Sequence, residues 1–110
     1  LLENPDKNFI FIAEKDGEIA GFLTAKLQKI DSIFKNPEIL YLDDVFVLPK
    51  YRRKKVATLL IQEAEKLAKE KEIKRIQARV YSFNNGMHKF LESKGYRSPY
   101  ATWDKVLNLK

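Results

Sequence analysis

Four consecutive basic residues, Arg52 to Lys55, lie in the stretch of the sequence that is richest in chemistry. The apolar segment before them reads as a buried strand that ends at Pro49, because proline cannot donate to a sheet ladder. The residues after them have the spacing of a helix, whose first N–H groups lack partners and whose dipole leaves that end partly positive. A basic turn from a strand into a helix predicts a site for phosphate groups.

The same stretch has a simpler interpretation. It could be a solvated basic turn in front of an amphipathic helix, and spacing and charge alone do not separate the two. The small residues Ala57 and Thr58 at the start of the helix let an anion approach the backbone, which the phosphate site requires.

The residues before the basic loop predict three strands. Residues 9–14 are apolar and β-prone, and residues 19–27 continue them after Asp16-Gly17, a strong hairpin signal. Gly21 within the second strand predicts a bulge or a close approach of two backbones. Residues 39–48 then read as a long, largely buried strand.

The residues after the loop alternate between helix and strand. Apolar residues recur at spacings of three and four between residues 55 and 71, which predicts an amphipathic helix. Residues 75–81 alternate as a strand does. Asn84-Asn85-Gly86 then breaks the chain, and either asparagine could cap a helix over residues 86–94. That helix should bury Met87, Phe90 and Leu91 and end at Gly95 in a left-handed cap.

One or two final strands are expected from Tyr96 and from residues 103–109. The predicted fold is therefore α/β, a mixed and mostly antiparallel sheet flanked by helices. A length of 110 residues is typical of one domain, so residues 1–110 are expected to form a single domain.

Composition excludes several classes of function. The chain has no cysteine, which rules out disulfides, thiolate metal sites and a cysteine nucleophile, and its one histidine argues against a histidine-rich metal site. No apolar run is long enough to cross a bilayer and no signal peptide is visible, so we expect a cytoplasmic protein without a membrane partner. The net charge of +6 attracts anions, although lysine-rich surfaces also serve solubility.

The loop and its surroundings resemble the GNAT superfamily of N-acetyltransferases. In that family an Arg/Gln-x-x-Gly-x-Gly/Ala pattern after a strand cradles the pyrophosphate of acetyl-coenzyme A, and this chain has Arg52-Arg53-Lys54-Lys55-Val56-Ala57. A second family signature, Asn-x-x-Ala-x-x-x-Tyr-Glu-x-x-Gly-Phe, is matched in spacing by Asn84, Met87, Leu91, Glu92, Gly95 and Tyr96. Two signatures in the right order are more specific than either alone.

The resemblance implies the acyl-CoA N-acyltransferase fold, acetyl-CoA as cosubstrate and no metal. Backbone groups at the end of the strand would pair with the acetyl and pantetheine amides, and the strand over residues 75–81 would splay away to open this slot. Amides of the loop would hold the pyrophosphate, and Asn84 would contact the pantetheine arm. The implied cofactor-binding residues are Val45, Phe46, Val47, Arg52, Arg53, Lys54, Lys55, Val56, Ala57, Thr58 and Asn84.

Three positions depart from the family pattern. Lys55 stands where the family has glycine, which lets backbone and phosphate come close. Leu91 occupies the place of the tyrosine that protonates the leaving thiolate, and leucine cannot donate a proton. Arg79 stands where some members have a glutamate base. Cofactor binding is therefore expected to be weaker or rearranged, and the usual acid and base do not carry over.

Other residues could replace this acid and base. Asp43 and Asp44 precede the expected acetyl site on alternate faces of the strand, so only one would face the cleft, where it could take a proton through water or attract a cationic substrate. Each could equally be a solvated or capping carboxylate. Tyr81 could act as the acid or be a packed aromatic. Tyr51 and Tyr96 are expected to be structural, and His88 to face solvent.

The function implied is transfer of acetyl from acetyl-CoA to a primary amine of a small molecule or peptide. The alternative is a module that binds acyl-CoA without turnover, given Leu91 and Lys55. Nucleic-acid binding is a third interpretation, and the single basic turn without interleaved aromatics argues against it.

The family fold normally begins with a strand and helices that this chain does not supply, and residues 1–4 could be the tail of such a helix. The domain is therefore expected to be incomplete at its N-terminus, with an open edge and apolar surface that favour a homodimer.

Overall fold

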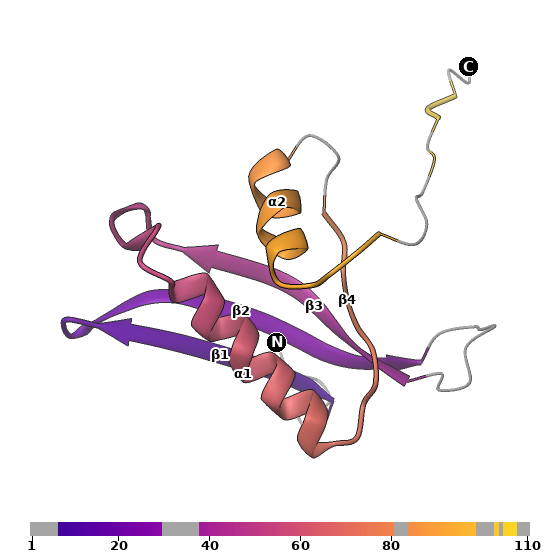
Figure 1. Cartoon of the computed structure of the whole chain (residues 1–110), viewed down its shortest axis with the longest axis horizontal. Helices are drawn as coiled ribbons and strands as arrows, with labels where there is room; N and C mark the ends of the chain where they lie inside the picture. Colours follow the sequence, from indigo (N-terminus) through magenta and orange to yellow (C-terminus); the bar gives the residue numbers. More distant parts are fainter. Residues whose placement is uncertain (1–6, 30–37, 81–83, 99–102, 104, 108–110) are drawn as a thin grey trace. The chain divides into compact units, whose positions relative to one another are not determined.

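A computed structural model describes residues 7–29, 38–80, 84–98, 103 and 105–107 of the chain. Contacts between Cα atoms divide the chain into two compact units, residues 1–79 and residues 80–110. Each unit is described here by itself. The first contains the sheet and the longer helix, and the second contains the shorter helix (Figure 1).

The first unit is built on a mixed four-stranded sheet with the order β1-β2-β3-β4. Its first three strands are antiparallel, and β4 pairs with β3 in parallel. The elements are β1 (Asn8–Lys15), β2 (Glu18–Lys29), β3 (Glu38–Val47), the 3-10 helix η1 (Pro49–Tyr51), α1 (Val56–Glu70) and β4 (Ile76–Ala78). The mixed, mostly antiparallel sheet expected from the sequence is confirmed.

The β1–β2 hairpin turns at Asp16 and Gly17, which have φ angles of 53° and 78°. Positive φ at both central residues is the mark of a type I′ turn, whose twist matches that of the flanking strands. Glycine reaches this conformation without strain, and aspartate reaches it more easily than most residues. The hairpin signal in the sequence is confirmed.

Gly21 lies where β2 and β3 come closest. A Cβ atom added there would lie 2.5 Å from the carbonyl oxygen of Phe46 and 3.2 Å from the Cα of Val47. Only glycine fits without moving β3. Next to it, the register between β1 and β2 shifts and leaves Ala20 as an extra residue. The sequence allowed a bulge or a close approach here, and the structure has both.

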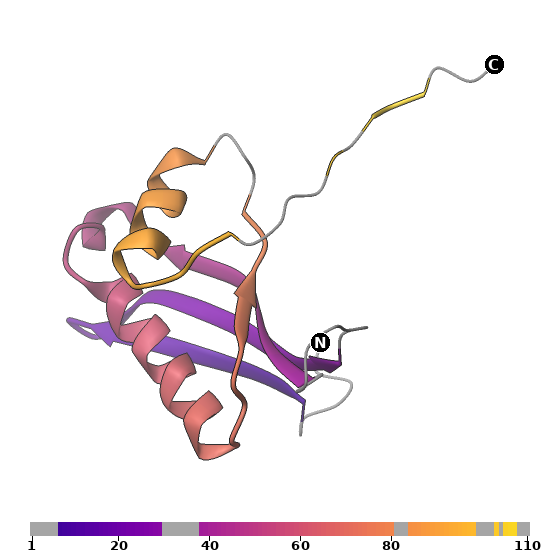
Figure 2. The same ribbon diagram turned by 45° about the vertical axis from the view of Figure 1, so that its right-hand side comes forward.

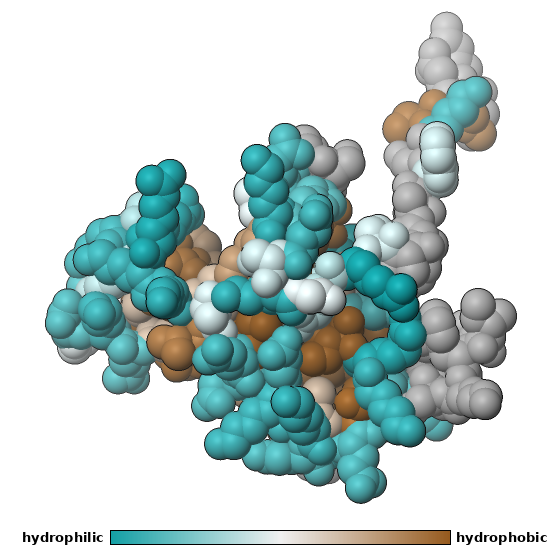
Figure 3. All heavy atoms as spheres, in the orientation of Figure 1, coloured by the Kyte–Doolittle hydropathy of each residue, from teal (hydrophilic) through white to brown (hydrophobic). Residues whose placement is uncertain are grey.

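Helix α1 lies across one face of the sheet and makes the core of the first unit (Figures 1 and 2). Burying an aliphatic side chain of this kind stabilises the fold by about 1.5–3 kcal/mol. Polar side chains cover much of the face on which the helix lies (Figure 3). The buried apolar residues are Ala20, Leu23, Ala25, Ile39, Leu40, Leu42, Tyr51, Val56, Leu60, Ile61, Ala64 and Ala68.

The opposite face of the sheet exposes large apolar side chains. Ile10, Ile12 and Phe46 are 44%, 55% and 42% exposed. The register pairs Ile12 with Phe22, and Phe22 with Phe46, so these side chains share a face. The rings of Phe22 and Phe46 lie 5.7 Å apart between centroids. An open apolar surface was expected, and the homodimer inferred from it stays a prediction.

The second unit contains α2 (Asn85–Ser93), which is capped at both ends. The Asn84 side chain accepts a hydrogen bond from the backbone N–H of Met87 at 3.1 Å. At the other end the N–H groups of Gly95 and Tyr96 bond to the carbonyls of Glu92 and Leu91, and Gly95 has a φ of 89°. This is the Schellman arrangement. Both predicted caps are confirmed.

The final strands predicted from Tyr96 and residues 103–109 are wrong for the residues described. Tyr96 belongs to the cap of α2, and Trp103, Lys105, Val106 and Leu107 are not in a strand. A strand is stable only when it is paired, and the described sheet pairs β1 to β4 alone. Trp103 is accordingly 93% exposed.

Neither α1 nor α2 could span a membrane, since no helix among the described residues is both long and apolar enough.

Candidate functional site

The basic loop between β3 and α1 holds two residues in the left-handed conformation. Arg53 has a φ of 64° and Lys55 a φ of 65°, and Lys55 is the N-cap of α1. Turns that include left-handed residues gather successive backbone N–H groups into a concavity suited to an anion. Lys55 therefore adopts the backbone conformation that glycine would adopt without strain, and as a lysine it does so at a cost.

The N–H groups at the start of α1 are available to a ligand. The first helical bond runs from the N–H of Leu59 to the carbonyl of Lys55 at 3.1 Å, and no side chain caps this end. The N–H groups of Val56, Ala57 and Thr58 precede that bond and so have no partner within the helix. Together with the helix dipole they match the requirements of a phosphate group.

Contacts with the β1–β2 hairpin hold the entry to this loop. The Tyr51 hydroxyl donates to the carbonyl of Lys15 at 3.2 Å, and the Lys50 ammonium lies 2.6 Å from the Glu18 carboxylate. The bond between Lys50 and Glu18 lowers the pKa of Glu18 and raises the pKa of Lys50. Burial raises the pKa of Tyr51, which is a structural residue as expected.

Arg52 differs from the other three basic residues of the loop. Its Nε donates to the carbonyl of Val47 at 3.1 Å, so the guanidinium lies at the end of β3. All four basic side chains are exposed. The loop thus holds Arg52 beside the end of β3 and presents three further cations on its surface.

The second half of β3 has an open edge. Strand β4 pairs only with Leu40, Tyr41 and Leu42. Residues 44–47 pair with β2 alone among the described residues. The strand predicted over residues 75–81 is therefore shorter than expected, and its pairing with β3 ends at Leu42, next to the bulged Asp43. The result is the splay between the two strands that a cofactor slot requires.

Backbone groups of β3 alternate between the two sides of the strand. The N–H groups of Asp44 and Leu48 bond toward β2, to the Thr24 hydroxyl and the Ala20 carbonyl. Alternation then turns the backbone groups of Val45 and Val47 toward the open edge and those of Phe46 toward β2. The tight approach of the Phe46 carbonyl to Gly21 agrees with this.

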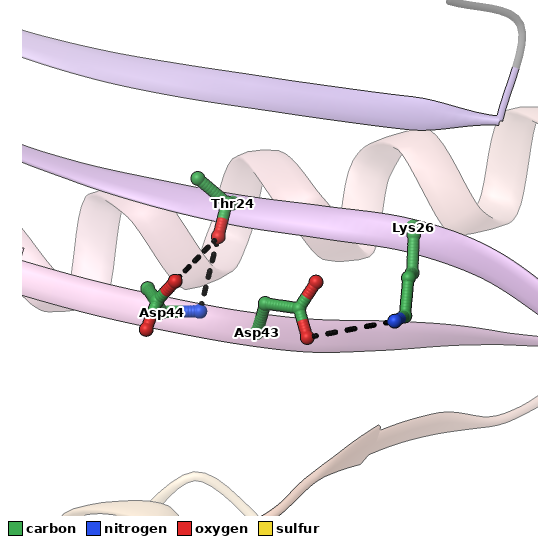
Figure 4. A network of polar contacts seen from close by, with 4 residues as sticks. All are labelled: Thr24, Lys26, Asp43 and Asp44. Carbon is green, nitrogen blue, oxygen red and sulfur yellow. Dashed lines mark hydrogen bonds and ion pairs between the residues drawn. The ribbon is translucent and has the colours of Figure 1, made fainter. Parts of the chain in front are cut away.

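A β-bulge in β3 changes the expected placement of the two aspartates. The register pairs Thr24 with Asp44 and Ala25 with Leu42, so Asp43 is an extra residue. The prediction that Asp43 and Asp44 lie on alternate faces is wrong, because a bulge interrupts the alternation of side chains. Both carboxylates contact side chains of one face of β2, the face opposite α1 (Figure 4).

Different partners hold the two carboxylates, as Figure 4 shows. The Asp43 carboxylate lies 3.9 Å from the Lys26 ammonium. The Thr24 hydroxyl accepts from the backbone N–H of Asp44 at 3.1 Å and lies 3.4 Å from its carboxylate. The sequence did not indicate Thr24 or Lys26, since only the pairing register brings them to the bulge.

Comparison with known proteins identifies the family. The sequence model of the acetyltransferase (GNAT) family matches residues 1–96. The chain belongs to the GNAT family. The resemblance found in the two sequence signatures is therefore confirmed, and the left-handed Lys55 stands at the glycine position of the first.

Two curated relatives of this GNAT chain are N-acetyltransferases. One from Archaeoglobus fulgidus, whose function is uncharacterized, is 30% identical over 94 residues, with 86% of this chain and 63% of the relative covered. One from Bacillus subtilis, provisionally named a ribosomal protein bS18-alanine N-acetyltransferase, is 30% identical over 107 residues, with 93% of this chain and 65% of the relative covered. The chain thus spans just under two thirds of their length.

The fold is that of GNAT acetyltransferases of known structure. The aminoglycoside acetyltransferase AAC(6')-Iy, solved with a bisubstrate analogue of CoA and acetylneamine, superimposes with a TM-score of 0.81. It is 23% identical, with 94% of this chain and 71% of that chain covered. The predicted acyl-CoA N-acyltransferase fold is confirmed.

The remaining candidate site residues come after β4 in the sequence. Tyr81 falls outside the described residues. Asn84 uses its side-chain oxygen to cap α2, so only its amide group is left for a ligand. Leu91 takes part in the C-terminal cap through its carbonyl, and Arg79 is exposed. His88 is half-buried rather than fully exposed to solvent.

Proposed function

We propose that the protein is an N-acetyltransferase that moves acetyl from acetyl-CoA to a primary amine. One observation carries this proposal. The N–H groups of Val56, Ala57 and Thr58 lack helical partners, and they lie in the loop that directly follows the open edge of β3. A phosphate site in line with an unpaired strand edge suits a ligand that has a diphosphate at one end and amides along its length.

The proposed cofactor contacts follow from these two features. The loop from Arg52 to Thr58 would hold the diphosphate through its N–H groups and its positive charge. The backbone groups of Val45 and the N–H of Val47 would pair with amides of the pantetheine arm at the open edge, since the Val47 carbonyl accepts from Arg52. Phe46, whose backbone faces β2, would contribute its side chain alone. A contact of Asn84 with the arm is proposed from its place in the second GNAT signature alone.

The reaction needs few groups beyond those that bind. The amine nitrogen attacks the carbonyl carbon of the thioester, a C–N bond forms and the C–S bond breaks. The amine loses a proton, and the departing sulfur gains one. Asp43 and Asp44 would attract the amine or accept its proton. Tyr81 is the remaining candidate for the acid, since Leu91 cannot donate a proton.

The proposed acceptors are amines. The Bacillus subtilis relative is named for the alanine of a ribosomal protein, and the structural neighbour for an aminoglycoside. The alanine N-terminus and the aminoglycoside in these names have primary amines, which are cationic when protonated. A cationic acceptor fits two carboxylates on one face of β3. We propose an acceptor of this kind, either a peptide N-terminus or a small amine, and a cytoplasmic location.

A second candidate function is an acyl-CoA-binding module without turnover. Leu91 favours it, because the residue at this place in the GNAT signature is normally the proton donor. Both functions predict binding of acetyl-CoA, and only the first predicts release of a free thiol.

A thiol-trapping assay tests the choice. The protein is incubated with acetyl-CoA and a panel of peptides with free N-termini, aminoglycosides and simple polyamines. Release of thiol that depends on the amine, with acetylated product seen by mass spectrometry, supports the transferase. Binding of acetyl-CoA without thiol release for any amine contradicts it and leaves the binding module.

A further inference from the structure

Thr24 on β2 closes the bulge in β3 with a single hydroxyl. That hydroxyl accepts from the N–H of Asp44 at 3.1 Å and lies 3.4 Å from the Asp44 carboxylate, to which it donates (Figure 4). A bulge leaves backbone groups without their ordinary ladder partners, and a side chain from the facing strand can replace one of them. Thr24 therefore holds both the backbone and the carboxylate of one residue.

Asp43, the other aspartate of the bulge, has a charged partner. The Lys26 ammonium lies 3.9 Å from the Asp43 carboxylate and 5.5 Å from the centre of the Tyr41 ring. Asp43 thus has a cation beside it, and the partner of Asp44 is a neutral hydroxyl. Among the described residues, Asp43 forms an ion pair and Asp44 does not, so the charge of Asp44 is the less compensated of the two.

Asp44 lies next to the open edge of β3, where its charge could act on a bound acceptor. It directly precedes Val45, the first residue whose backbone groups face the open edge beyond β4. A carboxylate there lies at the start of the segment along which the acyl arm is proposed to lie. Its orientation depends on the bulge, and the geometry of the bulge depends on Thr24.

We propose that Thr24 is a positioning residue that holds Asp44 as the carboxylate facing the acceptor amine, while Asp43 stays paired with Lys26. This assignment rests on the acetyl transfer proposed above. Asp44 is thus distinguished from the adjacent Asp43, and Thr24 on the neighbouring strand belongs to neither family signature.

Steady-state kinetics of four variants test the proposal, with the best amine from the panel. Thr24→Val keeps the shape of the side chain and removes the hydroxyl, and Thr24→Ser restores the hydroxyl. Asp44→Asn and Asp43→Asn remove one charge each. Binding of acetyl-CoA is measured for every variant by calorimetry, which separates damage to the cofactor site from damage to the acceptor side.

Thr24→Val and Asp44→Asn should each lower kcat/KM for the amine by about tenfold or more, since misplacing a group that orients substrate by about 1 Å can cost up to about 100-fold. Thr24→Ser should recover most of this loss, and Asp43→Asn should cost less than Asp44→Asn. The Kd for acetyl-CoA should stay within about twofold, because neither side chain belongs to the phosphate loop.

Either of two results would overturn the inference and leave acetyl transfer intact. The first is an active protein in which Thr24→Val equals the unaltered chain or Thr24→Ser fails as badly. The second is a loss for Asp43→Asn that matches or exceeds the loss for Asp44→Asn. An unaltered protein that binds acetyl-CoA and acetylates no amine would instead overturn the proposed function, and the acceptor role of Asp44 with it.

Discussion

The bulge within β3 and the loop after β3 present different chemical groups to a ligand. The loop after it presents backbone N–H groups, and its side chains can vary within limits, as Lys55 in place of glycine shows. The bulge at Asp43 and Asp44 presents carboxylates whose placement depends on Thr24 and Lys26 of another strand. A site made of backbone follows from local chain geometry, whereas a site made of side chains follows from tertiary pairing.

The comparison predicts different responses to substitution. The loop should be sensitive to charge and to φ, and it should tolerate many changes of side-chain type. The bulge should be sensitive to single atoms, as the Thr24 variants test.

Charge reversal in the loop should have the largest effect. The double variant Lys54→Glu/Lys55→Glu replaces two cations with anions beside the proposed diphosphate. Like charges brought together at a binding site cost several kcal/mol, so the affinity for CoA should fall by about 100-fold. Calorimetry at low salt measures it.

A matched control for this variant lies on α1. Lys66→Glu/Lys69→Glu changes the net charge by the same amount at exposed positions of the helix. Its affinity for CoA should change little, because exposed charges beyond about 8–10 Å are screened at moderate salt. Equal losses for the two double variants would show that only the overall charge of the protein matters.

Gly21→Ala should damage both regions at once. The added Cβ would meet the Phe46 carbonyl at 2.5 Å and the Val47 Cα at 3.2 Å, so β3 must move. Overpacking of this kind costs about 1–3 kcal/mol, measured as a loss in the free energy of unfolding by urea denaturation.

Gly86→Ala is the control for Gly21→Ala. Among the described residues, a Cβ at Gly86 would have only the Asn84 side chain nearby, at 3.9 Å, and Gly86 lies in α2. Alanine in a helix should raise stability by about 0.4–1 kcal/mol. A stable Gly21→Ala variant with normal CoA affinity would contradict the close packing of β2 on β3.

Lys55→Gly should stabilise the chain. A non-glycine residue in the left-handed conformation costs about 1–2 kcal/mol, and glycine removes most of that cost. The Tm should rise by several degrees, since about 1 kcal/mol corresponds to roughly 4–8 °C in a small domain. Lys55→Ala removes the same charge and keeps the strain, so it should bring no such gain. A gain for alanine equal to that for glycine would assign the effect to charge.

Glu18→Gln should have the smallest effect, confined to acid pH. The bond to Lys50 lowers the pKa of Glu18 from its usual 4.5, so its contribution to stability is present above that value and is lost as the pH falls through the lowered pKa. The Tm difference between the two proteins should be visible at pH 7 and shrink below about 4.5. A difference that is independent of pH would show that the pair does not titrate as a pair.

The sequence predicted features whose causes lie close together in the chain. The turn at Asp16-Gly17, the cap at Gly95 and the amphipathic face of α1 each depend on residues within one short stretch of chain. The two family signatures also lie in short stretches of sequence, one in the loop before α1 and one over α2 and its caps.

Features that depend on pairing between distant strands could not be predicted. The register shift that makes Asp43 an extra residue arises from the fit of β3 to β2, and nothing in the sequence around Asp43 signals it. The alternation rule therefore placed the two aspartates on opposite faces. The length of β4 could not be predicted either, since its ladder ends at Ala78, opposite the residue of β3 that precedes the bulge.

Backbone N–H groups at the start of α1 are proposed to hold a diphosphate. Calorimetric titration of the protein with CoA and, separately, with pantetheine, which lacks every phosphate, tests this proposal most directly. CoA should bind at least about 100-fold more tightly than pantetheine, since hydrogen bonds to charged groups contribute about 1.5–3 kcal/mol each. Equal affinities for the two compounds, or no heat with CoA at modest ionic strength, would contradict the account.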